Sequence, residues 1–108
     1  MDYINRIEIQ GRVGTVRTNV AGENMVANFS LVTEHMYKSR DGNAVNETTW
    51  HHVVAWEGRD MPDLKTIEKG LLLNVKGRVR FTKYTASDGT EKQIYEILAS
   101  SIKAIGNQ

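Results

Sequence analysis

The sequence of 108 residues contains no cysteine, one proline and no long apolar run. Without cysteine the chain forms neither a disulfide nor a thiolate metal site. No segment approaches the ~20 apolar residues that cross a bilayer, and the first residues lack the basic and apolar regions of a secretory signal. Repeats, low-complexity runs and linkers are also missing, so the sequence predicts a single cytoplasmic domain with no membrane segment.

The chain also has little net charge. Its 14 basic and 13 acidic side chains leave a formal charge of +1. A strongly basic composition would indicate a polyanionic partner, and this average does not, so the distribution of charge matters more. Acidic residues are concentrated in expected turns and in one short expected helix, whereas several basic residues lie in expected strands.

Apolar residues recur at every second position through most of the sequence, which is the period of a strand. In the first strand Ile7, Ile9 and Val13 alternate with polar residues, and Gly11 and Gly14 indicate a bulge or a barrel bend. Residues 18–24 are expected to form a loop. The further strands are expected at about residues 25–37, 47–57, 71–82 and 93–102, with Asp-Gly turns at 41–42 and 88–89.

A short helix is expected between the third and fourth strands. Pro62 lies near its start, Leu64 and Ile67 are three residues apart, and Gly70 follows its end, which predicts about two turns. Five strands with a helix in this place match the OB-fold, an all-β Greek-key barrel that binds oligonucleotides or oligosaccharides. An isolated antiparallel sheet or an SH3-like barrel would also fit this number of strands.

Three cations share one face of the expected fourth strand. Lys76, Arg78 and Arg80 stand at alternate positions with no acidic residue between them. Their spacing of roughly 6–7 Å is comparable to the phosphate spacing of an extended nucleic acid. A solvated strand face is the alternative interpretation of the same pattern.

The aromatic residues indicate a surface for stacking. Trp50 and Trp56 are six residues apart in the third strand and therefore point to the same side. Tyr37 lies at the end of the second strand beside Lys38, and Tyr84 follows the fourth strand. Nucleobases of any sequence stack on such rings. For Trp50 a position in the core is an equally good interpretation.

The sequence offers no sign of catalysis, of a cofactor or of a metal. His51 and His52 are adjacent on a strand, so they point to opposite faces and do not chelate one ion, and His35 stands apart. The Gly11 to Gly14 spacing is not a dinucleotide fingerprint because no helix follows it. A nucleophile elbow is also absent from the sequence, so we expect no enzymatic activity.

Segments in order along the chain carry a resemblance to a known family. The third contains T-W-H-H-V-V, similar to the family's T-x-W-H-x-V-V, and Tyr84 precedes a glycine turn. The other segments are residues 5–14, 26–33, 69–70 and 75–80. Together they resemble the bacterial single-stranded DNA-binding protein family. The resemblance implies sequence-tolerant binding and protection of single-stranded DNA in replication, repair and recombination.

The same resemblance implies roles for individual residues. Trp56 stands where a phenylalanine is common in the family. Family members commonly form homotetramers whose first strands pair between subunits. The implied base-stacking residues are Tyr37, Trp50, Trp56 and Tyr84; the implied phosphate contacts are Lys38, Arg40, Lys76, Arg78, Arg80 and Lys83; the implied subunit contacts are Ile7, Ile9 and His51.

The end of the sequence departs from the family pattern. A folded core at 1–103 is followed by a short tail at 104–108, without the flexible linker and acidic tip with which family members recruit replication and repair enzymes. Either the sequence is a truncated form of a longer chain or the protein naturally lacks this tail, so the resemblance does not carry over that recruitment. Three alternative functions stay open: a primosomal adaptor of the same fold, an oligomeric protein-interaction module without DNA binding, and an oligosaccharide binder.

Overall fold

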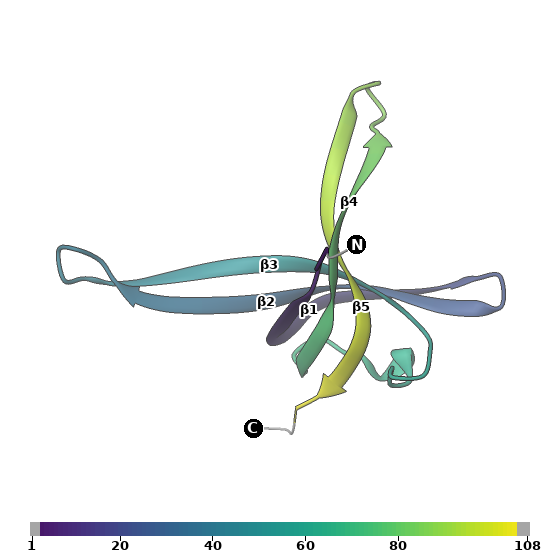
Figure 1. Cartoon of the computed structure of the whole chain (residues 1–108), viewed down its shortest axis with the longest axis horizontal. Coiled ribbons are helices and arrows are strands. Elements are labelled where there is room, and N and C mark those ends of the chain that lie inside the picture. The colour runs from purple at the N-terminus through teal and green to yellow at the C-terminus, as the bar shows by residue number, and fades with distance from the viewer. Residues whose placement is uncertain (1–2, 106–108) are drawn as a thin grey trace.

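The computed structural model describes residues 3–105 as a small barrel from which three long hairpins project in different directions (Figure 1). The hairpins are formed by β1 with β2, β2 with β3, and β4 with β5. The elements are β1 (Ile7–Ala21), β2 (Asn24–Lys38), β3 (Ala44–Trp56), the 3-10 turn η1 (Leu64–Thr66), β4 (Leu72–Thr85) and β5 (Glu91–Ala104).

The strands close in the order β1-β2-β3-β5-β4, with β4 returning to β1. All neighbours are antiparallel except β3 and β5, which pair in parallel over Val53 with Ile97 and Val54 with Leu98. A closed five-stranded barrel with a single short helical turn between β3 and β4 confirms the OB-fold prediction. An open antiparallel sheet is excluded by the closure.

The barrel interior is filled by side chains that alternate along the strands. On β2 and β3 the period of two places Ala27, Phe29 and Leu31 opposite Val53 and Ala55, all almost fully buried. Burying one such large apolar side chain contributes about 1.5–3 kcal/mol. The remaining core residues are Val13, Leu64, Ile67, Leu73, Val75, Ile97 and Ile102.

The expectation of a loop at residues 18–24 is wrong. Thr18 to Ala21 continue β1 and pair with β2, so the connection is only Gly22 and Glu23. Gly22 has a φ of +67°, which the first position of a tight hairpin turn requires. Polar residues indicate a loop in a segment that packs on a core. Here both faces of the hairpin are exposed to solvent, so a strand can form from polar residues through backbone hydrogen bonds alone.

The expected two-turn helix is also shorter than predicted. Only η1 is helical, and Asp63 caps it by accepting a hydrogen bond from the backbone N–H of Lys65 at 3.0 Å. Leu64 and Ile67 both enter the core, and a 3-10 turn with three residues per turn places them on the same side. Ile67 is already extended, with ψ at 115°, so the helix ends there.

The ordered core extends beyond the predicted end at 103. Ala104 belongs to β5, and the backbone N–H of Ile105 donates to the carbonyl of Leu72 at 2.9 Å. The rest of the expected tail, 106–108, lies outside the described residues. The other strands are also longer than expected, and Tyr84 therefore lies within β4 rather than after it.

Glycines in the strands mark places where two chain segments approach closely. The bulge predicted near Gly14 is present: the register of β1 against β2 shifts between Val13 and Val16. A Cβ atom on Gly77 would lie 2.2 Å from the carbonyl oxygen of Leu98, where β4 crosses β5. Only glycine fits there without displacing backbone.

Replacing Gly77 with alanine is therefore expected to lower the free energy of unfolding by about 1–3 kcal/mol through overpacking. Gly58→Ala is the matched control, because the nearest atom to its Cβ is 3.9 Å away. That change is expected to stay within about 0.5 kcal/mol of the unchanged protein. Urea unfolding followed by circular dichroism measures both, and equal midpoints for the two variants would contradict the close approach.

Candidate nucleic-acid interface

The barrel has an outer face made of the residues that alternate with the core. The antiparallel register places Trp50 beside Val32, His52 beside Ser30, and Trp56 beside Val26. Paired residues point to the same side of a sheet, so the two tryptophans share this outer face. Both rings are accessible, Trp50 at 60% and Trp56 at 42% of full exposure. The interpretation of Trp50 as a core residue is therefore wrong.

The Trp50 ring lies over the bulge of β1. A Cβ on Gly14 would lie 2.5 Å from Cζ3 of the ring, so the ring can pack against β1 only because Gly14 has no side chain. Beside it the hydroxyl of Ser30 accepts a hydrogen bond from the backbone N–H of Thr15 at 2.9 Å, replacing a ladder bond that the bulge interrupts. The ring is thus held against the barrel on one side and open on the other.

A hollow of about 480 Å³ lies on the outer face, beside the row that links Ser30 to His52. Its polar lining consists of Thr15, Arg17, Asn28, Ser30 and His52. Arg17 pairs with Asn28, so it stands on this face in a row between those of the two tryptophans. Sequence reasoning missed Arg17, because the bulge shifts the alternation of β1 and because residues 18–24 were expected to form a loop. Gly14 predicts a bulge, and a bulge there reverses which residues of β1 face outward after it. Applying that reversal would have placed Arg17 on the outer face.

The outer face continues from β3 through β5 to β4. The parallel pairing of β3 with β5 brings His52 of β3 to Glu96 of β5, with Nε2 at 3.8 Å from Oε2. Arg80 stands opposite Glu96, and Arg78 and Tyr84 share its side of β4. Tyr84 is about half exposed. Rings and cations of β1, β3 and β4 therefore share the outer side of the sheet, and β5 contributes Glu96 between them.

The stripe of cations on β4 is less positive than the sequence suggested. Arg80 donates from Nε to Oε1 of Glu96 at 2.8 Å, and Glu8 of β1 stands opposite Lys76 in the strand register, although its carboxylate accepts a hydrogen bond from Asn74. Burial by itself raises the pKa of Glu96, but hydrogen bonds from Arg80 and Thr82 and the charges of Arg80 and His52 outweigh it, so the pKa is lowered. No acid interrupts the stripe along β4, as the sequence indicated, but acids from neighbouring strands lie beside it.

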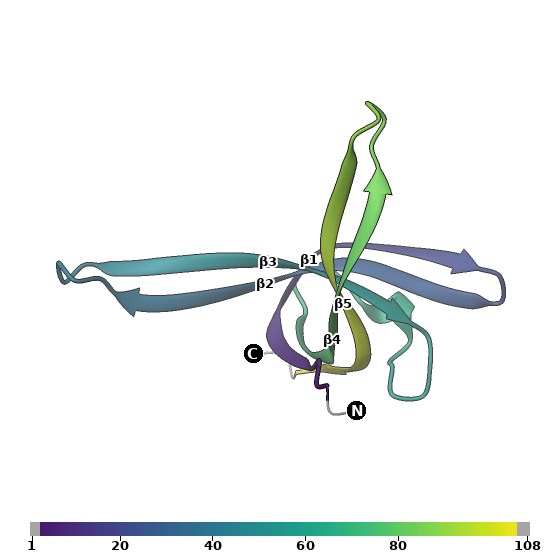
Figure 2. The same cartoon turned by 45° about the horizontal axis from the view of Figure 1, so that its top comes forward.

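Other predicted site residues are dispersed over the hairpins. Lys38 has the parity of the outer face, whereas Tyr37 has that of the core and lies 6.0 Å from His35, ring to ring. Lys83 alternates with Tyr84 and so points to the opposite face of the β4–β5 hairpin. Arg40 lies in the turn at the tip of the β2–β3 hairpin. Figure 2 shows that the hairpins point away from one another, so the structure does not bring these residues together with the tryptophans.

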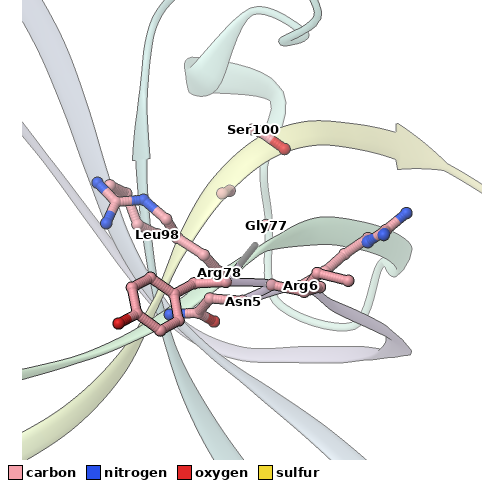
Figure 3. Close-up of a pocket in the computed structure, with 9 residues that line it drawn as sticks. Asn5, Arg6, Gly77, Arg78, Leu98 and Ser100 are labelled. Atoms are coloured by element: carbon pink, nitrogen blue, oxygen red, sulfur yellow. The ribbon is translucent and has the colours of Figure 1, made fainter. Parts of the chain in front are cut away.

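A second hollow of about 460 Å³ lies beside the segment before β1 (Figure 3). The Asn5 side chain holds this segment to β4, donating to the carbonyl of Val79 at 2.7 Å and accepting from its N–H at 3.0 Å. Arg6 and Arg78 line the hollow, but Figure 3 shows their guanidinium groups pointing away from each other. They do not converge on a single anion.

The three residues expected at subunit contacts differ in their surroundings. Ile7 and Ile9 pack partly buried against the barrel core, so their side chains are not free surface. The Nε2 atom of His51 lies 3.0 Å from the hydroxyl of Thr33. Within residues 3–105 nothing reaches the buried Nδ1 of His51, and burial lowers the pKa of this imidazole. His51 therefore favours the neutral form.

Neither a metal site nor a membrane helix is found in the part of the chain that the structure describes. No group of three or more histidine, cysteine, aspartate or glutamate residues there is placed to hold a metal ion. No helix there is long and apolar enough to cross a membrane.

Known proteins resemble this chain over nearly its whole length. The single-stranded DNA-binding protein of Neisseria meningitidis is 32% identical over 110 residues, which cover 97% of this chain and 62% of that protein. The mitochondrial single-stranded DNA-binding protein of Oryctolagus cuniculus is 31% identical over 115 residues, covering 97% and 77%. The chain thus spans about six-tenths of the length of its bacterial relative.

Solved structures agree with the fold. A chain from the complex of Plasmodium falciparum SSB with ssDNA superposes with a TM-score of 0.82 at 27% identity, covering 98% of both chains. The single-stranded DNA-binding protein from Thermus aquaticus, solved as a deletion mutant, superposes with a TM-score of 0.78 at 18% identity over 97% of this chain and 52% of that one, which supports the fold alone. The model of the single-strand binding protein family matches residues 4–105, and this chain belongs to that family.

Proposed function

We propose that this chain binds single-stranded DNA with little sequence preference and protects it during replication, repair and recombination. The observation that carries the proposal is the pair of exposed tryptophans on one barrel face, with Trp50 seated over Gly14. The proposal is supported by the P. falciparum relative, whose structure is a complex with ssDNA. The protein acts by binding alone, without covalent chemistry.

Stacking on Trp50, Trp56 and Tyr84 supplies the sequence-tolerant part of the affinity. A base stacked on an aromatic ring is worth about 1–3 kcal/mol, and every base has a face to offer. In a duplex these faces are covered by neighbouring bases, so a single strand is preferred. Tyr37 adds a further ring where the strand passes over the edge of the β2–β3 hairpin.

Cations beside the rings hold the phosphates. Arg17 and Arg78 belong to the outer face itself, and Lys76 extends it toward β1. Arg80 is left out of this set because its Nε is bound to Glu96. The remaining phosphate contacts, Lys38, Arg40 and Lys83, come from the hairpins and require the strand to wrap around the barrel.

Self-assembly, as a homotetramer, belongs to the same proposal. Among the described residues the backbone of Ile7 to Gly11 pairs on one side only, with β4, which leaves a strand edge for a second copy. This edge includes Ile7 and Ile9, the residues expected where first strands pair between subunits. The unpaired Nδ1 of His51 also supports a subunit contact. A nucleoid-associated protein of the cytoplasm fits the bacterial relatives, although relatives in mitochondria exist.

One observation favours protein contacts as a second role. Phe81 is 66% exposed, and its ring lies 5.9 Å from that of Tyr95 on the β4–β5 hairpin face opposite Arg80 and Tyr84. Apolar rings on this separate face suit a protein partner or a second copy. The two roles occupy different faces and can be tested separately.

Titration with a single-stranded oligothymidine is expected to quench tryptophan fluorescence strongly, because stacked bases cover Trp50 and Trp56. The same length of duplex should quench little, and added salt should weaken binding steeply. Absence of quenching with either ligand, in a folded protein, would overturn the single-strand proposal and favour the interaction role.

Alanine at a stacking ring is expected to weaken binding by about 1–3 kcal/mol, or roughly 5- to 150-fold. Trp50→Ala tests the ring on β3 and Tyr84→Ala tests the ring on β4. Phe81→Ala is the control, because its ring lies on the opposite face of the β4–β5 hairpin. Fluorescence anisotropy of a labelled oligothymidine measures all three without relying on tryptophan. Equal losses in Tyr84→Ala and Phe81→Ala would contradict the assignment of faces.

His51 is expected to make stability depend on pH. Its folded-state pKa lies below the ordinary value of about 6.5, so the folded protein binds fewer protons than the unfolded chain between the two values. The contribution of neutral His51 to the free energy of unfolding is fully present above about pH 6.5 and is lost as the pH falls through the folded-state pKa. Urea unfolding between pH 5 and 7.5 should show a smaller pH dependence in His51→Gln, and an unchanged dependence would count against the burial of this imidazole.

A further inference from the structure

Glu96 is a buried carboxylate on a face that we propose to bind a polyanion. It lies in the middle of β5 and is only 7% exposed, and within residues 3–105 it is the one buried charged side chain. Buried charges are rare unless they are paired. The surroundings of Glu96 therefore need an explanation.

Three side chains surround the carboxylate. Oε1 accepts hydrogen bonds from Nε of Arg80 at 2.8 Å and from the hydroxyl of Thr82 at 2.9 Å. Oε2 faces Nε2 of His52 at 3.8 Å. A carboxylate that accepts a hydrogen bond from a guanidinium carries one negative charge, as a phosphodiester does, and it occupies the same kind of donor.

The location of Glu96 makes its charge relevant to binding. β5 lies between β3, which carries Trp50 and Trp56, and β4, which carries Tyr84. A strand of DNA that stacks on rings from both neighbours must cross β5. Its phosphates then pass a site where Arg80 is already paired with an internal anion.

We propose that Glu96 acts as an internal substitute for phosphate that neutralises Arg80 and so limits the electrostatic attraction of the outer face. This inference rests on the proposed function. Arg80 then releases no counterion when DNA binds, because its partner is a carboxylate of the same chain. Stacking keeps the strand bound, while the weaker electrostatic attraction at the centre of the face lets it shift and exchange.

The number of neutralised phosphates can be read from the salt dependence of binding. For single strands the slope of log K against log salt changes by about 0.7 for each phosphate contact. Glu96→Gln keeps the size of the side chain and an acceptor for Arg80 but removes the charge. We expect it to bind oligothymidine more tightly at low salt, with a slope steeper by about 0.7.

Three further variants separate charge from shape. Arg80→Gln should make the slope shallower by about 0.7, because it leaves the charge of Glu96 uncompensated. The double variant Arg80→Gln with Glu96→Gln restores neutrality and should return to the slope of the unchanged protein. Glu96→Asp retains the charge and should leave the slope unaltered. Circular dichroism and urea unfolding establish that each variant is folded.

The outcomes distinguish this inference from the proposed function. If the unchanged protein binds oligothymidine but Glu96→Gln has the same slope or binds more weakly, Glu96 only positions Arg80 and the inference is wrong. If Glu96→Gln does not fold, a double variant no steeper than Arg80→Gln overturns it equally. If the unchanged protein does not bind oligothymidine, the proposed function fails and this inference fails with it.

Discussion

The parallel contact between β3 and β5 joins two antiparallel sheets that otherwise meet only through β1 and β4. It involves Val53 with Ile97 and Val54 with Leu98. Residues on its inner side complete the core, and residues on its outer side connect the tryptophans of β3 to Tyr84 of β4. The hairpins diverge (Figure 2) and Tyr84 lies near the tip of the β4–β5 hairpin, so this closure is what connects its side of the sheet to that of the tryptophans. Under the proposed function, the barrel therefore sets the order of the rings that a DNA strand would meet.

The bulge in β1 has a similar effect on a smaller scale. One extra residue opposite Ser30 lets Val13 and Val16 both turn toward the barrel and moves Arg17 to the outer face. The glycine within the bulge also leaves space for the Trp50 ring. A single local irregularity therefore seats a ring and adds a cation nearby. Bulges next to binding sites commonly redirect side chains in this way.

Much of the barrel follows from the period of two, and the sequence predicted the five strands, both Asp-Gly turns and the shared side of Trp50 and Trp56. The misses have a common physical cause. Residues 18–24 form a hairpin because backbone hydrogen bonds between strands do not require apolar side chains. Lys83 points away from Tyr84 because β4 continues past residue 82, so the two side chains alternate. The pairing of Arg80 with Glu96 depends on the register across a hairpin, which a pattern within one strand does not contain.

A net charge of +1 is small for a protein that we propose to bind a polyanion, and the pairing of Arg80 with Glu96 reduces the local charge further. Glu96 is paired with Arg80 on the outer face, and Glu8 stands opposite Lys76 in the register at its edge. Exposed rings are retained, by contrast, although each leaves apolar surface in water. Under the proposed function, this combination would shift the affinity from phosphate attraction, which salt screens, to stacking, which requires unpaired bases. On that proposal, a weaker attraction for phosphates favours single strands over duplex, because both carry phosphates and only single strands offer free base faces.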